Sequence, residues 1–413
     1  MDERELQARN VAEGVARQSY GKLVAFLAAR TRDVAAAEDA LSEAFASALA
    51  DWPKNGCPAN PEGWLLTVAR RKAIDMLRRR RHEETVDEWQ VMSDSLAAAE
   101  SNGPIPDQRL ALMFACAHPA IDAAVRAPLI LQVVLGLDAK AIGSAFLTSP
   151  AAMGKRLVRA KEKIKHTGIP FAVPEPEELP TRLEVVLDAI YAAFAEGWTD
   201  PTGGDVARRD LTEESLFLAS LVVELLPQSA EALGLLALML HAEARRRARR
   251  SEEGEFVPLA EQDVELWDAA MIEQAEGHLR LASKLHSPGR YQLEAALQSA
   301  HVHRLRTGKW NWPEVAQLYD ALLATTGSPV VAINRALAIA EIEGAETGLE
   351  RLRELGGDER LAQYQPYWAA RAELLTKTEA HEEARKAYEI AIGLERDPAV
   401  RRFLQGRQSA LKH

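Results

Sequence analysis

Residues 60–81, NPEGWLLTVARRKAIDMLRRRR, carry the clearest helix signal in the sequence. Asn60 suits the N-cap, Pro61 suits the first helical position, and Glu62 complements the positive end of the helix dipole. The helical repeat places four residues on one face, which we expect to face a core: Leu65, Ala69, Ala73 and Met76. Within residues 70–81, seven cations stand against one anion, so this part of the helix is strongly basic.

This basic helix belongs to an acidic chain of 413 residues with a formal net charge of −11. Concentrated cations in an acidic protein favour a polyanionic partner, and nucleic acid is the obvious one. The simpler interpretation is a charged face that contacts only solvent. The preceding loop, DWPKNGCPANPEG at residues 51–63, favours nucleic acid because such a loop can hold a phosphate backbone. Trp64 can stack on an unpaired base, although a core position is an equally good interpretation.

The composition indicates an all-α protein. The chain is 47% hydrophobic and rich in Ala, Leu, Glu and Arg, while runs of alternating β-branched residues are almost absent. Cys57 and Cys116 form neither a disulfide framework nor a zinc motif, so we expect structural thiols and no metal or cofactor. The sequence contains no HExxH, GxxxxGK[ST] or GxSxG motif, and we therefore expect no enzymatic activity.

The N-terminal sequence and the distribution of charge indicate where the protein is located and which part of it binds a polyanion. The charged N-terminal sequence MDERELQARN does not resemble a signal peptide, and no run of about 18 apolar residues is present. We therefore expect a soluble, cytoplasmic protein without membrane contact. Residues 1–168 have 23 basic and 21 acidic side chains, whereas residues 169–413 have 27 basic and 40 acidic ones. The basic segments thus lie in the front part of the chain.

Residues 138–165 form a helix-turn-helix candidate. DAKAIGSAF (138–146) is the expected first helix, LTSP (147–150) the turn and AAMGKRLVRAKEKIK (151–165) the second helix. Four residues of the second helix form its expected buried stripe: Met153, Leu157, Ala160 and Ile164. The cap, the outer face and its flanks supply the expected DNA contacts, which are Ser149, Ala151, Ala152, Lys155, Arg156, Arg159 and Lys161. The alternative is a basic amphipathic helix that packs on a bundle.

An acidic helix precedes the loop. AEDALSEAFASAL at residues 37–49 has helical spacing, and its carboxylates are Glu38, Asp39 and Glu43. We interpret them as a surface for a basic partner rather than as paired catalytic carboxylates.

The C-terminal part contains an approximate repeat. Ala336, Gly348 and Leu352 precede a second set of similar residues by 36 positions. A small residue, a second small residue twelve positions later and a bulky residue four further on are typical of tetratricopeptide helix pairs. The expected packing positions are Ala336, Gly348, Ala372, Ala384, Tyr388 and Ala391. The alternative is a stack of helical hairpins without a binding role.

Taken together, AEDALSEAF (37–45), WLLTVARRKAIDMLRRRR (64–81) and RLVRAK (156–161) resemble the extracytoplasmic-function sigma factors of bacterial RNA polymerase. More specifically, the sequence resembles a subgroup of this family that has a long tetratricopeptide-like C-terminal extension. This resemblance covers nearly the whole chain. The segments that carry it are FACAHPAI (114–121), GIPFAVP (168–174), LGLLALMLHAEARRRAR (233–249), YQLEAALQSAH (291–301) and SPVVAINRALAIAE (328–341).

The resemblance implies two small helical sigma domains, the second with a helix-turn-helix, joined by a flexible linker and followed by an α-solenoid. The expected bounds are 1–84 for sigma domain two, 85–106 for the linker, 107–168 for sigma domain four, 169–180 for a proline-rich connector and 181–413 for the tetratricopeptide-like extension.

The resemblance also implies roles for single residues. The acidic helix would bind the β′ clamp helices of core RNA polymerase, and the β subunit is a further expected partner. The loop and the basic helix would recognise and open the −10 element of promoter DNA, with contacts from Asn60, Trp64, Arg70, Arg71, Arg78 and Arg79. The helix-turn-helix would read the −35 element. Ser42 stands where Gln is common in the family, which leaves the contact expected at this position open. AAMGKRL (151–157) has few base-reading side chains, which leaves the target sequence of the helix open.

The expected function is therefore that of an RNA polymerase sigma factor whose C-terminal extension is a built-in regulator, able to contact the sigma domains. One alternative is a stand-alone helix-turn-helix transcription regulator with a tetratricopeptide-like sensor domain. Another is a tetratricopeptide scaffold whose basic helices bind acidic peptides or RNA. Co-purification with core polymerase separates the three.

Overall fold

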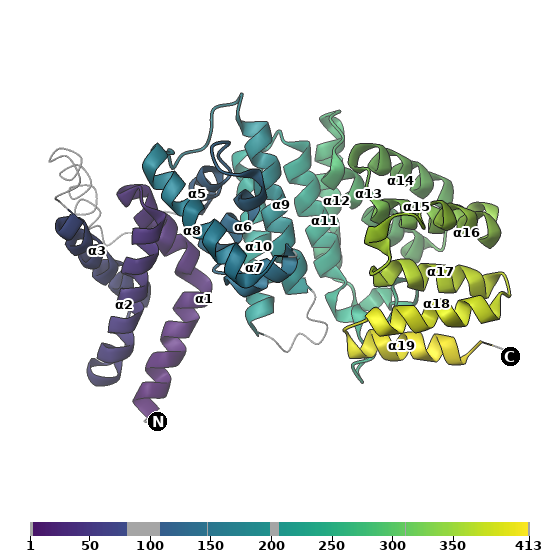
Figure 1. Ribbon diagram of the computed structural model, residues 1–413, viewed down its shortest axis with the longest axis horizontal. Coiled ribbons are helices and arrows are strands. Elements are labelled where there is room, and N and C mark those ends of the chain that lie inside the picture. The colour runs from purple at the N-terminus through teal and green to yellow at the C-terminus, as the bar shows by residue number, and fades with distance from the viewer. Residues whose placement is uncertain (1–2, 81–107, 147, 199–205, 310, 412–413) are drawn as a thin grey trace. The chain divides into compact units, whose positions relative to one another are not determined.

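The computed structural model describes residues 3–80, 108–146, 148–198, 206–309 and 311–411, and these contain helices and no strand. The expectation of an all-α fold is confirmed. The chain divides into two compact units, Met1–Leu221 and Val222–His413. Figure 1 shows the helices in chain order, coloured from purple to yellow.

The first unit is built from two groups of helices. In the first group, α1, α2 and α3 pack on one another. In the second group, α5 to α8 pack on one another, and α9 covers α5 and α6. The bounds are α1 Glu3–Thr31, α2 Val34–Asn55, α3 Pro61–Arg80, α5 Arg109–Cys116, α6 Ala123–Val133, α7 Ala139–Ala145, α8 Pro150–Thr167, α9 Leu179–Trp198 and α10 Val206–Leu225.

Local sequence explains where α2 begins and ends. Asp33 is its N-cap, and the carboxylate accepts a hydrogen bond of 3.0 Å from the backbone N–H of Ala36. Gly56 follows the last turn with φ of 88°, a conformation that glycine adopts without strain. The chain then turns and α3 begins at Pro61, as the sequence predicts.

The predicted buried faces are largely observed. In α3, Leu65, Ala69 and Ala73 are at most 1% exposed, whereas Met76 is half-buried. In α8, all four residues of the predicted stripe are buried, namely Met153, Leu157, Ala160 and Ile164. The segment expected to be a linker, residues 85–106, lies outside the described residues.

The first unit extends further than the predicted sigma domains. The helix α9 begins at Leu179 and packs on α5 and α6, so residues beyond 181 help to cover their core. The division between the units falls at Leu221, whereas the sequence places the beginning of the extension at residue 181. The predicted domain bounds stay predictions.

The second unit consists mainly of successive helices that pack on their neighbours. The α-helices are α11 Ala230–Ala244, α12 Ala269–Lys284, α13 Arg290–Thr307, α14 Trp312–Thr326, α15 Pro329–Glu343, α16 Ala345–Glu354, α17 Gln365–Lys377, α18 His381–Leu394 and α19 Pro398–Ser409. Short 3₁₀-helices are η1 Arg246–Arg249, η2 Leu259–Glu261, η3 Val264–Leu266 and η4 Glu359–Leu361.

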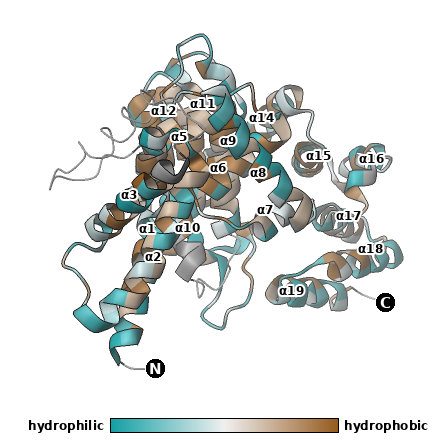
Figure 2. Ribbon diagram, turned by 60° about the vertical axis from the view of Figure 1, so that its left-hand side comes forward, coloured by the Kyte–Doolittle hydropathy of each residue, from teal (hydrophilic) through white to brown (hydrophobic). Residues whose placement is uncertain are grey.

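Hydropathy follows this packing. In Figure 2 the hydrophobic residues, in brown, are prominent on α6 and α15, and the N-terminal turns of α1 are teal. Residues 3–7 at the beginning of α1 are all exposed, whereas Leu23, Val24 and Leu27 further along are completely buried. The core of the α1–α3 group therefore lies toward the C-terminal half of α1.

The predicted repeat positions are all buried in the second unit. Ala336 lies on α15, Gly348 on α16, Ala372 on α17, and Ala384, Tyr388 and Ala391 on α18. Five of them are at most 2% exposed, and Gly348 is also buried. That α15–α18 form tetratricopeptide-like pairs remains a prediction.

Two general features complete the fold. Within the part of the chain that the structure describes, no helix combines the length and the apolarity needed to cross a membrane. Nor do three or more His, Cys, Asp or Glu side chains gather as metal ligands would anywhere in those described segments.

Replacement of Gly348 by alanine tests the close contact between α15 and α16. A Cβ at this position would lie 2.5 Å from the Cβ of Ala340 and 3.0 Å from the carbonyl oxygen of Ala336. We expect Gly348→Ala to destabilise α15 and α16 by about 1–3 kcal/mol because the helices must separate. Hydrogen exchange of their backbone amides measures the loss.

Gly406→Ala in α19 is the matched control, because nothing lies within 4 Å of the added methyl group. Alanine should stabilise that helix by about 0.5–1 kcal/mol. Equal protection of α15 and α16 in the two variants would contradict the proposed close contact.

Candidate nucleic-acid interface

The loop before α3 is fastened to α1. Asn60 accepts a hydrogen bond of 3.0 Å from the backbone N–H of Gly63, so its side chain caps α3. The Glu62 carboxylate accepts a hydrogen bond from the Ser19 hydroxyl, and it lies 3.7 Å from the Lys22 ammonium. The first turn of α3 is therefore held against α1, which limits the motion of the loop that precedes it.

The surroundings of Trp64 are intermediate between the two interpretations that the sequence allows, a core position and a ring accessible for stacking on a base. Its ring packs edge-on against Trp52, with a centroid distance of 5.4 Å and an interplanar angle of 66°. Trp52 is 1% exposed, whereas Trp64 is half-buried. One part of the Trp64 ring thus packs on the core while another part is accessible at the N-terminal turn of α3.

The arginines of α3 are not equivalent. Arg71 is exposed. Arg70 is half-buried, and its guanidinium lies 5.2 Å from the ring centroid of Phe26, on which Arg30 also stacks at 3.5 Å. Burial, and next the charge of Arg70, lower the pKa of Arg30. Arg70 is therefore engaged in packing on α1.

Arg78 and Arg79 lie in the last turn of α3, and their side chains are outside the described residues. The expectation that they contact DNA stays a prediction.

The three acidic residues of α2 that the sequence assigns to a partner surface, Glu38, Asp39 and Glu43, have different surroundings. Asp39 is exposed. Glu43 is also exposed and lies 3.0 Å from the Lys72 ammonium of α3. Glu38 is only 15% exposed at its side chain and forms an ion pair of 2.6 Å with Lys161 of α8. Of these three residues, only Asp39 and Glu43 therefore present carboxylates to solvent.

The exposed face of α8 is basic. Ser149 is its N-cap and accepts a hydrogen bond of 3.3 Å from the backbone N–H of Ala152. Ala152 is half-buried and Lys161 is paired with Glu38, whereas the remaining predicted contacts are exposed: Ala151, Lys155, Arg156 and Arg159. This face carries three cations beside a small residue at the N-terminal turn, an arrangement that allows close approach to DNA.

Two family models match the chain. Residues 15–83 match sigma-70 region 2, and residues 182–283 match a family of unknown function, DUF6596. A Rhizobium meliloti (strain 1021) protein named "Uncharacterized protein R00370" is 36% identical over 383 residues, which cover 91% of this chain and 89% of that protein. The chain belongs to the sigma-70 family. As a sigma-70 family protein, it combines region 2 with a long C-terminal extension.

A further relative of this sigma-70 family protein is the "Probable RNA polymerase sigma factor RfaY" of Xanthomonas campestris pv. campestris. It is 32% identical over 163 residues, which cover 36% of this chain and 40% of the relative. No solved structure matches the chain. The region 2 match spans most of α1 and all of α2 and α3, and therefore includes the loop, Trp64 and the acidic face of α2.

Two residues of this region were not singled out in the sequence. Asp33 caps α2 and also lies 3.0 Å from the Lys165 ammonium of α8. Gly21 of α1 is buried against the carbonyl oxygen of Val134, where a Cβ would overlap that oxygen. An Asp before an alanine-rich helix is a local cap signal, but the partners of Asp33 and Gly21 are distant in sequence and leave no local pattern.

Replacement of Glu62 by glutamine tests the fastening of the loop. Glutamine keeps the shape but removes the charge that Ser19 and Lys22 contact, so we expect a loss of about 1 kcal/mol. Hydrogen exchange of amides in residues 56–63 should become about fivefold faster. Glu162→Gln, at an exposed position of α8, is the control and should leave this exchange unchanged. Similar exchange in both variants would show that Glu62 does not hold the loop.

Proposed function

We propose that this sigma-70 family protein directs core RNA polymerase to particular promoters and assists DNA melting, with the C-terminal extension as a built-in regulator. The observation that carries the proposal is the region 2 match over residues 15–83, since this segment contains the acidic face of α2 and the loop before α3. The proposed partners are core polymerase, through its β′ clamp helices and β subunit, and promoter DNA.

The α1–α3 group is the proposed element for polymerase binding and −10 recognition. Asp39 and Glu43 present carboxylates to solvent on one helix, which suits a basic partner surface. The loop next to Trp64 is fixed at Glu62. An ordered loop loses less conformational entropy when it binds a DNA strand. We propose that Trp64 stacks on an unpaired base and that Arg71 contacts phosphate, whereas Arg70 mainly supports the helix.

The helix α8 is the proposed reader of the −35 element. Ala151 is exposed in its N-terminal turn, and Lys155, Arg156 and Arg159 follow further along the accessible face. The helix α7 packs against α8, and Ser149 fixes the point where α8 begins. This arrangement suits insertion of the α8 N-terminus into a major groove, with the cations on the flanking phosphates.

Transcription with purified components tests the proposal. The full chain is added to core polymerase on a fork-junction promoter selected from genomic DNA by the reconstituted enzyme, and run-off product is measured. We expect co-purification with core polymerase and product that depends on the added chain. Binding of DNA without any affinity for core polymerase would instead support a stand-alone helix-turn-helix regulator. Binding of neither would favour the scaffold alternative.

Replacement of Lys155, Arg156 and Arg159 by alanine tests the role of α8. If each contacts one phosphate, holoenzyme binding to duplex −35 DNA should weaken by at least tenfold, and the salt slope should fall by about 3. Alanine at Lys284, Arg353 and Lys386, three exposed cations of the second unit, removes the same charge and is the control. Equal effects of the two triple variants would mean that α8 contributes only net charge.

Removal of residues 227–413 tests the regulatory role of the extension. This truncation keeps α9 and α10, because α9 packs on α5 and α6 in the first unit. We expect promoter output to change at least severalfold while hydrogen exchange of α1–α8 stays as in the full chain. Output that matches the full chain would exclude the extension as a regulator under the conditions assayed.

A further inference from the structure

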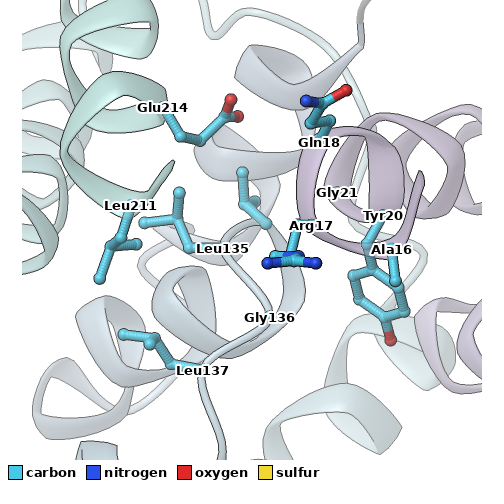
Figure 3. Close-up of a pocket in the computed structure, with 11 residues that line it drawn as sticks. Ala16, Arg17, Gln18, Tyr20, Gly21, Leu135, Gly136, Leu137, Leu211 and Glu214 are labelled. Atoms are coloured by element: carbon cyan, nitrogen blue, oxygen red, sulfur yellow. The ribbon is translucent and has the colours of Figure 1, made fainter. Parts of the chain in front are cut away.

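A cavity of about 370 Å³ lies in the first unit, where α1, the turn after α6 and α10 meet. Its volume falls within the range of roughly 300–1,000 Å³ that is typical of small-ligand sites. Figure 3 shows side chains of α1 on one side of this cavity and leucines of the other two elements on the opposite side. Three segments that are distant in sequence therefore build the cavity together.

One wall of the cavity is made of leucines. Leu135 and Leu137 come from the turn after α6, Leu211 comes from α10, and all three are half-buried. Gly136 follows the end of α6 with φ of 69°, and the N–H of Leu137 then donates a hydrogen bond of 3.1 Å to the carbonyl oxygen of Leu131. This turn places a leucine on either side of the glycine. The wall therefore suits the apolar part of a ligand.

The wall formed by α1 carries a cation, Arg17. Its Nε donates a hydrogen bond of 3.3 Å to the carbonyl oxygen of Glu13, and its Nη2 lies 4.0 Å from the carboxylate of the same residue. That carboxylate is closer to Arg9, at 2.7 Å. Among the residues that the structure describes, no other carboxylate lies within 4.0 Å of the Arg17 guanidinium. Two guanidinium groups thus share one carboxylate, and Arg17 retains positive charge for a further anion.

The other charged residue that lines the cavity, Glu214 of α10, is already neutralised. Its carboxylate forms an ion pair with the guanidinium of Arg109, a residue of α5 that is only 5% exposed. The same guanidinium lies 4.8 Å from the ring centroid of Phe217, which fixes the pair further. The charge available to a ligand is therefore that of Arg17, and it favours an anionic group.

Close contacts hold two of the walls in place beside the cavity. A Cβ at Gly21 of α1 would overlap the carbonyl oxygen of Val134, so the two backbones lie directly against each other. A Cβ at Gly136 would lie 3.7 Å from the ring of Tyr20, which is ordinary van der Waals contact. A cavity whose walls are already in contact needs little ordering when a ligand enters it.

We propose that this cavity binds a small amphipathic monocarboxylate. The carboxylate pairs with Arg17, and an apolar body of medium-chain or aryl type packs on Leu135, Leu137 and Leu211. The α1 residues of the site lie in the segment that matches sigma-70 region 2, and the α10 residues lie in the segment that matches DUF6596. The ligand therefore contacts both matched segments. Its binding by the free protein does not depend on the proposed sigma function.

Calorimetric titration of the full chain with octanoate tests the site. We expect one octanoate to bind with a Kd of about 0.01–1 mM, as befits a ligand of this size. Octanamide has the same chain without the charge and should bind about tenfold more weakly. Acetate has the charge without the chain and should show no measurable binding. Absence of octanoate binding, or equal binding of octanoate and octanamide, would overturn the proposal.

Arg17→Gln tests which residue holds the carboxylate. The substitution should weaken octanoate binding by about tenfold, to the level of octanamide, because the charge-assisted hydrogen bonds are lost. Arg4→Gln removes the same charge from an exposed position of α1 that does not line the cavity, and it is the matched control. Equal weakening in the two variants would show that octanoate responds only to net charge and would contradict the pairing with Arg17.

Hydrogen exchange locates the bound ligand without any substitution. Saturating octanoate should slow amide exchange in all three segments that line the cavity, residues 16–21, 134–137 and 211–214, while α17 and α18 of the second unit serve as the internal control. Octanamide at the same concentration should slow exchange in these segments less. Slower exchange confined to segments outside the cavity would place octanoate at another site and overturn the assignment.

Discussion

The alanine-rich face of α2 is the constraint on which the first unit depends. Ala37, Ala40, Ala44 and Ala48 are completely buried, and side chains that end at Cβ let neighbouring helices approach closely. The helix contacts α1, α3 and α8, which leaves only part of its surface for carboxylates. The fixed loop, the basic α3 and the contact with α8 are all positioned relative to this one helix.

Local pattern was sufficient for the helices and their faces. The N-cap at Ser149, the beginning of α3 at Pro61 and the buried stripe of α8 all follow from residues within a few turns of each other. Burial of the repeat positions in the second unit follows from spacing in the same way. Such signals depend on short-range geometry, and a single sequence carries that information.

The partners of individual charged side chains could not be predicted in the same way. Seven cations within residues 70–81 do not indicate that Arg70 turns toward Phe26 while Arg71 faces solvent. Nor does local spacing indicate that Glu38 and Lys161, assigned to two different macromolecules, pair with each other. Both outcomes depend on tertiary packing between segments that are far apart in sequence, as does the cover that α9 provides for α5 and α6.

Asp33 illustrates what this packing imposes on sequence variation. Its carboxylate both caps α2 and contacts Lys165. Asparagine would satisfy the cap but lacks the charge, whereas glutamate keeps the charge on a side chain that caps poorly. Either substitution would preserve one of the two functions at most. Position 33 should therefore vary less during evolution than its place at a helix end suggests, and any change there should be accompanied by a change at position 165.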